Sequence, residues 1–160
     1  SAEEVAAAAI DGLRSLSEFA LDYDINILVE NHGGYSSDGQ WLANVIQSTG
    51  MANCGTLPDF GNFCIKREAG DYYSSKCLEE YDRYKGMEEL MPYAKGVSGK
   101  SYDFDAEGNE TTIDFARMID IVKDAGYTGY IDVEYEGNVL SEEEGILATK
   151  KLIERILAQP

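Results

Sequence analysis

Apolar residues recur at helical spacing in several stretches of the chain. The first stretch, residues 1–21, opens with an S-x-x-E motif in which Ser1 and Glu4 are expected to cap a helix reciprocally. Residues 41–49, 112–126 and 141–157 are also predicted to be helices, and residues 77–93 are predicted to be helical on both sides of Gly86. Gly50 and Gly126 stand where helices are expected to end, because glycine readily adopts the conformation of a helix C-cap.

Short apolar or alternating stretches lie between these helices and predict strands at residues 25–30, 54–59, 94–98 and 130–136. The order is one helix followed by strand–helix units of roughly 35 to 40 residues, which favours a parallel sheet with helical crossovers. The predicted fold class is α/β, with parallel (β/α) units forming about half of a TIM-type (β/α)8 barrel, since a whole barrel takes about 250 residues. No linker divides the chain, so we expect residues 1–160 to be a single domain. It could be an excised half, a chain that closes with a second chain, or a small open sheet.

The charge of the chain argues against several classes of partner. Lys and Arg number 13 against 30 Asp and Glu, which gives a formal net charge of -17 at pH 7. Such a chain repels polyphosphates and anionic lipid surfaces, so we expect no nucleic acid and no membrane as partners. No apolar run reaches the roughly 18 residues of a membrane-spanning helix.

The cysteines are Cys54, Cys64 and Cys77, an odd number without the close spacing of a metal site. We interpret them as reduced thiols. Because reduced thiols are typical of a reducing compartment, a cytoplasmic location is expected.

Acidic residues recur where the predicted strands end. In parallel α/β folds the carboxyl ends of the strands lie at one edge and carry the chemistry. Carboxylates packed together there destabilise one another unless a divalent cation neutralises them, and oxygen ligands suit Mg2+ or Mn2+. An equally weighted interpretation is that these acids simply face solvent. The polar residues predicted at this edge are Glu30, Asp59, Ser98, Lys100, Glu134 and Glu136.

The stretch DFDAEGNETTID, which starts at Asp103 and ends at Asp114, is a competing cation site. Its acids at positions 1, 3, 5 and 12 and its glycine at position 6 match an EF-hand calcium loop. An EF-hand needs a helix before the loop, whereas Pro92 and Gly96 interrupt the preceding residues. We therefore interpret residues 105–109 as a polar turn before a helix.

Four segments together resemble the sugar phosphate isomerase/epimerase family, the xylose isomerase-like TIM barrels. The segments are ILVENHGGYSSD, LPDFGNF, YAKGVSGKSYDFDAEGNET and GYIDVEYEG. They are similar to the ends of strands five to eight of that family, so the resemblance implies that the chain is the carboxyl-terminal half of such a barrel. The family also includes hydroxypyruvate isomerase, ketose 3-epimerases and family 2 apurinic endonucleases. The endonuclease is the least favoured of these, because its histidine-rich zinc site does not suit a chain with one histidine.

The resemblance implies a site for one divalent cation, Mn2+ or Mg2+, with Zn2+ as an alternative. Its metal ligands would be Glu30, Asp59 and Glu134. Ser98 stands where the family has a metal-binding histidine, so the ion is expected to be held by carboxylates and water. Glu136 shares a strand face with Glu134 and is an alternative ligand.

The resemblance also implies a reaction. It is a metal-dependent sugar isomerisation or epimerisation of a ketose or sugar phosphate through an enediolate, in which Glu30 and Glu134 remove and return a proton. Substrate contacts would come from His32, Asn62 and Lys100, with Asn62 in place of a family histidine. His32 fits equally well as a loop residue that stabilises the glycine turn after it.

The predicted half-barrel has consequences for assembly. Its open sheet edges favour a homo-oligomer or a missing amino-terminal half that completes the barrel around a small sugar or sugar phosphate. The non-enzymatic alternative is an inactive half-barrel or an acidic binding or interaction module.

Overall fold

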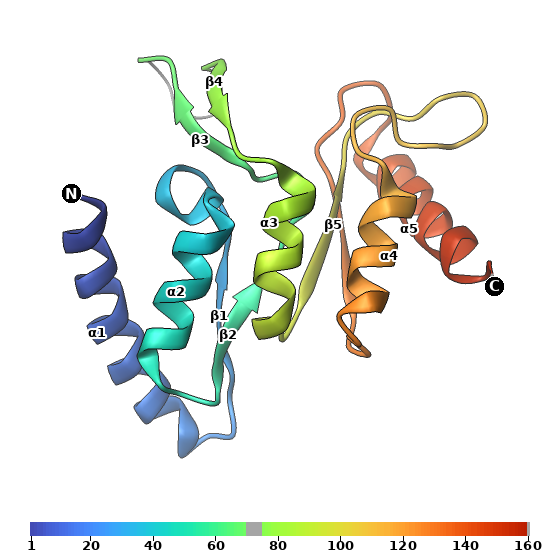
Figure 1. The fold of residues 1–160 in the computed structure, drawn as a ribbon. Coiled ribbons are helices and arrows are strands. Elements are labelled where there is room, and N and C mark those ends of the chain that lie inside the picture. Colours follow the sequence, from blue (N-terminus) through green and yellow to red (C-terminus); the bar gives the residue numbers. More distant parts are fainter. Residues whose placement is uncertain (70–74, 160) are drawn as a thin grey trace.

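The computed structural model describes residues 1–69 and 75–159, which form a mixed α/β fold (Figure 1). The helices run in chain order across the molecule, so that the amino and carboxyl ends lie on opposite sides in Figure 1. The helical elements are α1 (Ala2–Leu21), η1 (Gly34–Ser37), α2 (Gly39–Thr49), α3 (Arg83–Leu90), η2 (Met91–Tyr93), α4 (Phe115–Asp124) and α5 (Glu142–Leu157). The strands are β1 (Ile27–Glu30), β2 (Cys54–Leu57), β3 (Cys64–Arg67), β4 (Cys77–Glu80), β5 (Val97–Ser101) and β6 (Ile131–Tyr135).

The helix ends follow from local side-chain chemistry. Ser1 and Ser141 both form capping boxes, with Glu4 and Glu144 respectively, and these boxes satisfy the first backbone amides of α1 and α5. Gly50 ends α2 in the left-handed conformation, with a φ of 69°. The helices predicted at residues 1–21, 41–49, 112–126 and 141–157 are therefore confirmed, with small changes at their ends.

Four parallel strands carry the site. β1 pairs with β2, and β5 pairs with β6, in parallel register. Two isolated parallel bridges, Thr56 to Ala94 and Asp59 to Ser98, join the β2 side to the β5 side, so the strand order is β1, β2, β5, β6. All four carboxyl ends consequently lie at one edge, as the order of the predicted units required. Among the described residues, these strands do not close into a barrel, because β1 and β6 have one strand neighbour each.

An antiparallel hairpin between β2 and α3 corrects the predicted helix at residues 77–93. Residues 77–80 form β4, which pairs with β3, and the helix begins only at Arg83 after an N-cap by Asp82. A disulfide joins Cys64 in β3 to Cys77 in β4, so the interpretation of these two cysteines as reduced thiols is wrong. Cys54 is a free, buried thiol. Residues 70–74, between β3 and β4 in the sequence, lie outside the described residues.

The disulfide also bears on the expected compartment. Disulfides persist in oxidising surroundings, so the cytoplasmic location loses the cysteine argument that supported it and stays a prediction. Among the described residues, the structure contains no helix that is both long and apolar enough to cross a bilayer.

The hydrophobic core lies between the strands and the helices α2 to α5. Phe60, Phe63, Met87, Leu90 and Met118 are among its fully enclosed side chains. Trp41 is partly buried and packs against this core. The core holds the helices against the outer face of the sheet and leaves the polar strand ends to form the site.

Candidate functional site

Three carboxylates from three different strand ends converge. Glu30 is the last residue of β1, Asp59 follows β2 and Glu134 lies near the end of β6. One carboxylate oxygen from each lies within 4.8 Å of the others. Sequence spacing alone placed these acids at one edge, and the fold brings them to a single point.

Asp59 is the innermost of the three, with an exposed fraction of 0%. Its Oδ1 atom accepts hydrogen bonds from the backbone amides of Gly61 (2.8 Å) and Asn62 (2.9 Å). Its Oδ2 atom accepts no hydrogen bond, and it lies 4.0 Å from Lys100 Nζ. Burial raises the pKa of Asp59 to about 7, against the opposing charge of Lys100. Because it accepts no hydrogen bond, this Oδ2 atom is available to a cation.

Glu134 is held by two donors. Its Oε2 atom accepts a hydrogen bond from Ser98 Oγ (3.0 Å), and its Oε1 atom lies 3.1 Å from Lys100 Nζ. Partial burial favours the neutral carboxyl, but the hydrogen bonds and charge of Lys100 outweigh it and lower the pKa of Glu134. Glu134 is therefore ionised at neutral pH. Ser98 thus orients a carboxylate; that it takes the place of a family histidine stays a prediction.

Asn62 connects Glu30 to the rest of the site. Its Nδ2 atom donates to Glu30 Oε1 at 3.0 Å, and its Oδ1 atom accepts from Lys100 Nζ at 3.2 Å. The amide therefore has both of its ends engaged by site residues. Its predicted role as a substrate contact stays a prediction.

Lys100 lies in the middle of these acids, with an exposed fraction of 1%. Its Nζ atom is 3.1 Å from Glu136 Oε1 and 4.0 Å from Asp59 Oδ2, in addition to its contact with Glu134. Burial works against the charged form, yet the surrounding carboxylates outweigh it and raise the pKa of the ammonium. Lys100 therefore lies at the acidic edge of the sheet, as predicted, and contacts carboxylates and an amide of the protein itself. Its role as a substrate contact stays a prediction.

Asn31 is a site residue for which the sequence suggested no role. It is fully buried directly after β1, and its Nδ2 atom donates to the backbone oxygens of Asp59 (3.0 Å) and Asn62 (3.1 Å). A polar amide directly after an apolar strand was the available signal, because buried amides need partners. Asn31 fastens the Asp59 loop to β1.

The remaining predicted residues lie at the rim. His32 is exposed in the loop after β1, where its backbone amide donates to Ser36 Oγ at 2.9 Å. The glycine turn after it is real, since Gly33 and Gly34 have φ values of 96° and 61°. Glu136 is exposed and contacts the site through Lys100. The substrate role of His32 and the ligand role of Glu136 stay predictions.

The competing calcium loop is not formed. The strand β5, rather than a helix, precedes Asp103. Asp105 accepts hydrogen bonds from the backbone amides of Glu107 (3.0 Å) and Asn109 (2.8 Å), and Gly108 has a φ of 76°. Residues 105–109 are therefore the polar turn that the sequence predicted.

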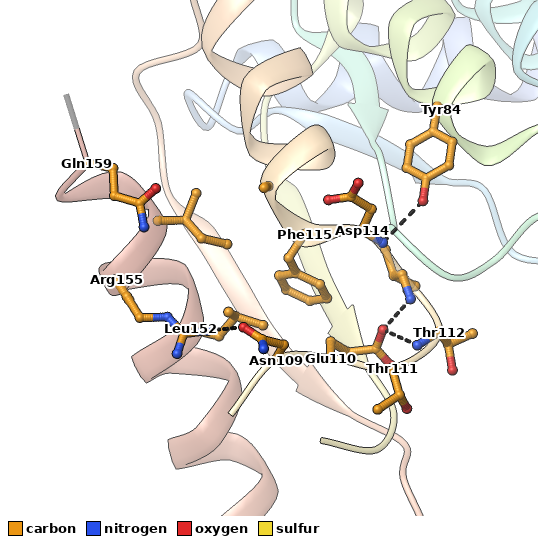
Figure 2. A pocket seen from close by; sticks show the side chains of 13 residues that line it. Tyr84, Asn109, Glu110, Thr111, Thr112, Asp114, Phe115, Leu152, Arg155 and Gln159 are labelled. Atoms are coloured by element: carbon orange, nitrogen blue, oxygen red, sulfur yellow. Dashed lines mark hydrogen bonds between the residues drawn. The ribbon is translucent and has the colours of Figure 1, made fainter. Parts of the chain in front are cut away.

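A pocket of about 720 Å³ lies away from the carboxylates, between the loop before α4 and the last turns of α5 (Figure 2). Arg155 reaches across it to Asn109 Oδ1 at 2.6 Å, and Tyr84 accepts from the amide of Asp114 at 3.1 Å. Figure 2 shows both contacts as dashed lines, one between the Arg155 and Asn109 side chains and one between the Tyr84 hydroxyl and the Asp114 backbone amide. None of the clustered carboxylates lines this pocket.

The donor set of the acid cluster fits a hard divalent cation. Glu30, Asp59 and Glu134 offer carboxylate oxygens within reach of one ion, and Asp59 contributes a buried oxygen that accepts no hydrogen bond. The single ammonium of Lys100 faces more carboxylates than it can neutralise, so negative charge remains. Oxygen ligands favour Mg2+ or Mn2+ over a softer metal.

Comparison with known proteins agrees with the resemblance. The family model of the xylose isomerase-like TIM barrel matches residues 1–156. The chain belongs to this family.

The curated relatives match shorter stretches. Over 57 residues the chain is 37% identical to the 3'-dehydrocarminate deglycosidase alpha subunit of a Microbacterium species. This match covers 36% of the chain and 16% of the relative. Over 66 residues it is 36% identical to the C-glycoside deglycosidase alpha subunit of Arthrobacter globiformis. This match covers 39% of the chain and 19% of the relative. The matched stretches thus span less than a fifth of either relative.

Proposed function

We propose that this chain supplies the metal-binding, proton-transferring face of a sugar isomerase or epimerase. The observation that carries the proposal is the convergence of Glu30, Asp59 and Glu134 at the carboxyl edge of the parallel strands. These three residues would hold one Mn2+ or Mg2+ ion. The bound ion would polarise a carbonyl of a ketose or sugar phosphate and so acidify the neighbouring C–H bond.

The protein's own residues then account for the proton transfer. Glu134 is ionised because Lys100 and Ser98 stabilise its charge, so it is suited to accept a proton from carbon. Glu30 enters the site from a different strand and is oriented by Asn62, so it is placed to return a proton from another direction. An epimerisation that uses two bases needs them on opposite faces of the substrate, because the proton leaves one face and arrives on the other, and Glu30 and Glu134 would take these two positions.

A second candidate, deglycosidation, is favoured by the names of the relatives. One of them is named a 3'-dehydrocarminate deglycosidase alpha subunit, and the prefix 3'-dehydro denotes a hydroxyl group oxidised to a carbonyl. Removing a proton beside that carbonyl would give an enolate, as in an isomerase. The group on the next carbon would then leave with its bonding electron pair and take up a proton from a glutamate, which completes an elimination. The same pair of glutamates would serve both reactions, which differ only in the steps after the first proton transfer.

The assembly that we propose follows from the open edges of the sheet. Large apolar side chains are exposed on α1 and in the segment after it, including Phe19, Tyr23 and Ile25, and Ile146 and Leu147 are exposed on α5. In the proposal, further (β/α) units cover these surfaces and complete the substrate site around the carboxylate cluster. A second copy of the chain or an amino-terminal half would supply these units. The relatives are alpha subunits, which supports a function within a complex.

Exchange of carbon-bound protons tests the proposed function directly. The protein with Mn2+ in D2O is incubated with ketoses, ketose phosphates and 3-keto glycosides, and deuterium uptake beside the carbonyl is followed by NMR. Glu30→Gln and Glu134→Gln should lower the exchange rate by about 100-fold or more, whereas the exposed Glu88→Gln should not. Exchange with epimer formation supports the first candidate, and release of the aglycone supports the second. Absence of exchange under all conditions leaves the inactive half-barrel or binding module.

A further inference from the structure

The three N–H donors of the Lys100 ammonium group all face acceptors of the protein itself. An ammonium group has three N–H bonds, and its nearest acceptors are Glu134 Oε1 (3.1 Å), Glu136 Oε1 (3.1 Å) and Asn62 Oδ1 (3.2 Å). The strand register sets this position, because Lys100 on β5 is paired directly with Glu134 on β6. No donor is left for a phosphate or a sugar oxygen while these contacts persist.

The ammonium also determines how Asn62 is turned. Because Lys100 can only donate, it contacts the amide oxygen of Asn62, and the amide nitrogen is left to face Glu30. A continuous series of contacts therefore runs from Glu134 through Lys100 and Asn62 to Glu30. It joins the carboxylates that lie on opposite sides of the sheet centre.

We propose that Lys100 is a resident counter-ion, which assembles the carboxylate cluster without a metal and weakens the affinity of the cluster for a divalent cation. The inference rests on the metal site of the proposed function and adds the residue that sets its affinity. Asp59 Oδ2 lies 4.0 Å from the ammonium, so any cation bound to that oxygen is close to a fixed positive charge. Such a charge, buried where water screens it poorly, opposes a divalent ion strongly.

The test replaces Lys100 and measures Mn2+ binding and thermal unfolding. In Lys100→Met the metal-free melting temperature should fall, because buried carboxylates lose their partner. The dissociation constant for Mn2+, measured by calorimetry, should fall by about tenfold or more. The rise in melting temperature on adding Mn2+ should be larger than in the wild type. Lys100→Arg retains the charge and should bind Mn2+ about as weakly as the wild type.

The controls separate this role from a purely structural one. Lys85→Met removes an exposed lysine that pairs with Glu89, and it should change neither Mn2+ binding nor the metal-dependent stabilisation. If Lys100→Met fails to fold without metal, the milder Lys100→Gln replaces it with the same expected tightening. A structural residue would lower stability with and without Mn2+ alike, and a phosphate-binding residue would raise KM for phosphorylated sugars at unchanged Mn2+ affinity.

The outcomes also distinguish the inference from the proposed function. Mn2+ binding by the wild type that is equal to or tighter than binding by both Lys100→Met and Lys100→Gln overturns the counter-ion role and leaves the metal site in place. Absence of Mn2+ binding in the wild type and in every variant overturns both. Binding by the charge-removed variants that exceeds binding by the wild type supports the inference.

Discussion

Asn31 and Asp59 are joined by a reciprocal pair of hydrogen bonds. The side-chain nitrogen of Asn31 donates to the Asp59 backbone oxygen at 3.0 Å, and the Asp59 amide donates to the Asn31 side-chain oxygen at 2.7 Å. A residue directly after β1 thereby fixes the backbone that carries the buried carboxylate after β2. We therefore expect the geometry of the cluster to depend on this pair of hydrogen bonds.

Asn31→Ala is expected to lower the free energy of unfolding by about 3 kcal/mol, because it leaves buried backbone groups without partners. Chemical denaturation measures this loss, and Mn2+ binding should weaken with it. Asn44→Ala removes an exposed amide in α2 and should change stability by less than about 0.5 kcal/mol. A small loss for Asn31→Ala, similar to the control, would show that the tie contributes little.

Mn2+ or Mg2+ should raise the melting temperature of the wild type, since an ion that binds only the folded state stabilises it by mass action. Glu30→Gln or Asp59→Asn should abolish the increase in melting temperature, because each replaces a negatively charged carboxylate ligand with a neutral amide. Asp103→Asn is the matched control in the acidic loop after β5. A response to Ca2+ that is lost in Asp103→Asn but kept in Asp59→Asn would place the cation in the loop instead.

The stability of the metal-free protein should depend on pH through Asp59. Its folded pKa of about 7 lies above its ordinary value of 3.8, so between these values the folded state binds more protons than the unfolded state. The free energy of unfolding should therefore fall as pH rises from about 4 towards 7 and level off above the folded pKa. In Asp59→Asn this part of the pH dependence should vanish, as denaturation at several pH values would reveal. Parallel profiles for the two proteins would contradict the raised pKa.

The disulfide between Cys64 and Cys77 should leave a single reactive thiol, Cys54, in the denatured, unreduced protein. Alkylation and intact-mass measurement count the thiols, with three expected after reduction. Reduction should also lower stability, by up to about 3 kcal/mol for a loop of this size. A Cys64→Ser/Cys77→Ser double variant should have the reduced stability from the start and show no further response to reductant. Three thiols without reduction would refute the disulfide.

The open edges at β1 and β6 should make the chain associate. Exposed apolar side chains on α1 and α5 favour association, whereas the net charge of -17 opposes it. Low salt should therefore favour smaller species, and raising the salt should favour larger ones, because salt screens the repulsion. Light scattering across protein and salt concentrations measures this. A monodisperse monomer under all conditions would contradict the proposed assembly.

Local chemistry in the sequence was sufficient to predict most of the helices and parallel strands. A capping box such as that of Ser141 and Glu144 lies within a single helical turn, so its residues meet whenever the helix forms. The alternation in β6 and the glycine after α2 act over equally short distances. The acids at the strand ends were also predictable, because parallel strands connected by helices must place their carboxyl ends together.

The tertiary structure alone decided which distant residues became partners. The hairpin was missed because β4 is stabilised by pairing with β3 and by a disulfide across 13 positions, whereas its own residues also suit a helix. The position of Lys100 among the carboxylates depends on the register between β5 and β6, and a shift of one residue would turn it to the other face. Contacts within one helical turn join residues that are close in the sequence, so the sequence alone predicts them. Contacts across the sheet form only once packing has fixed how the strands align.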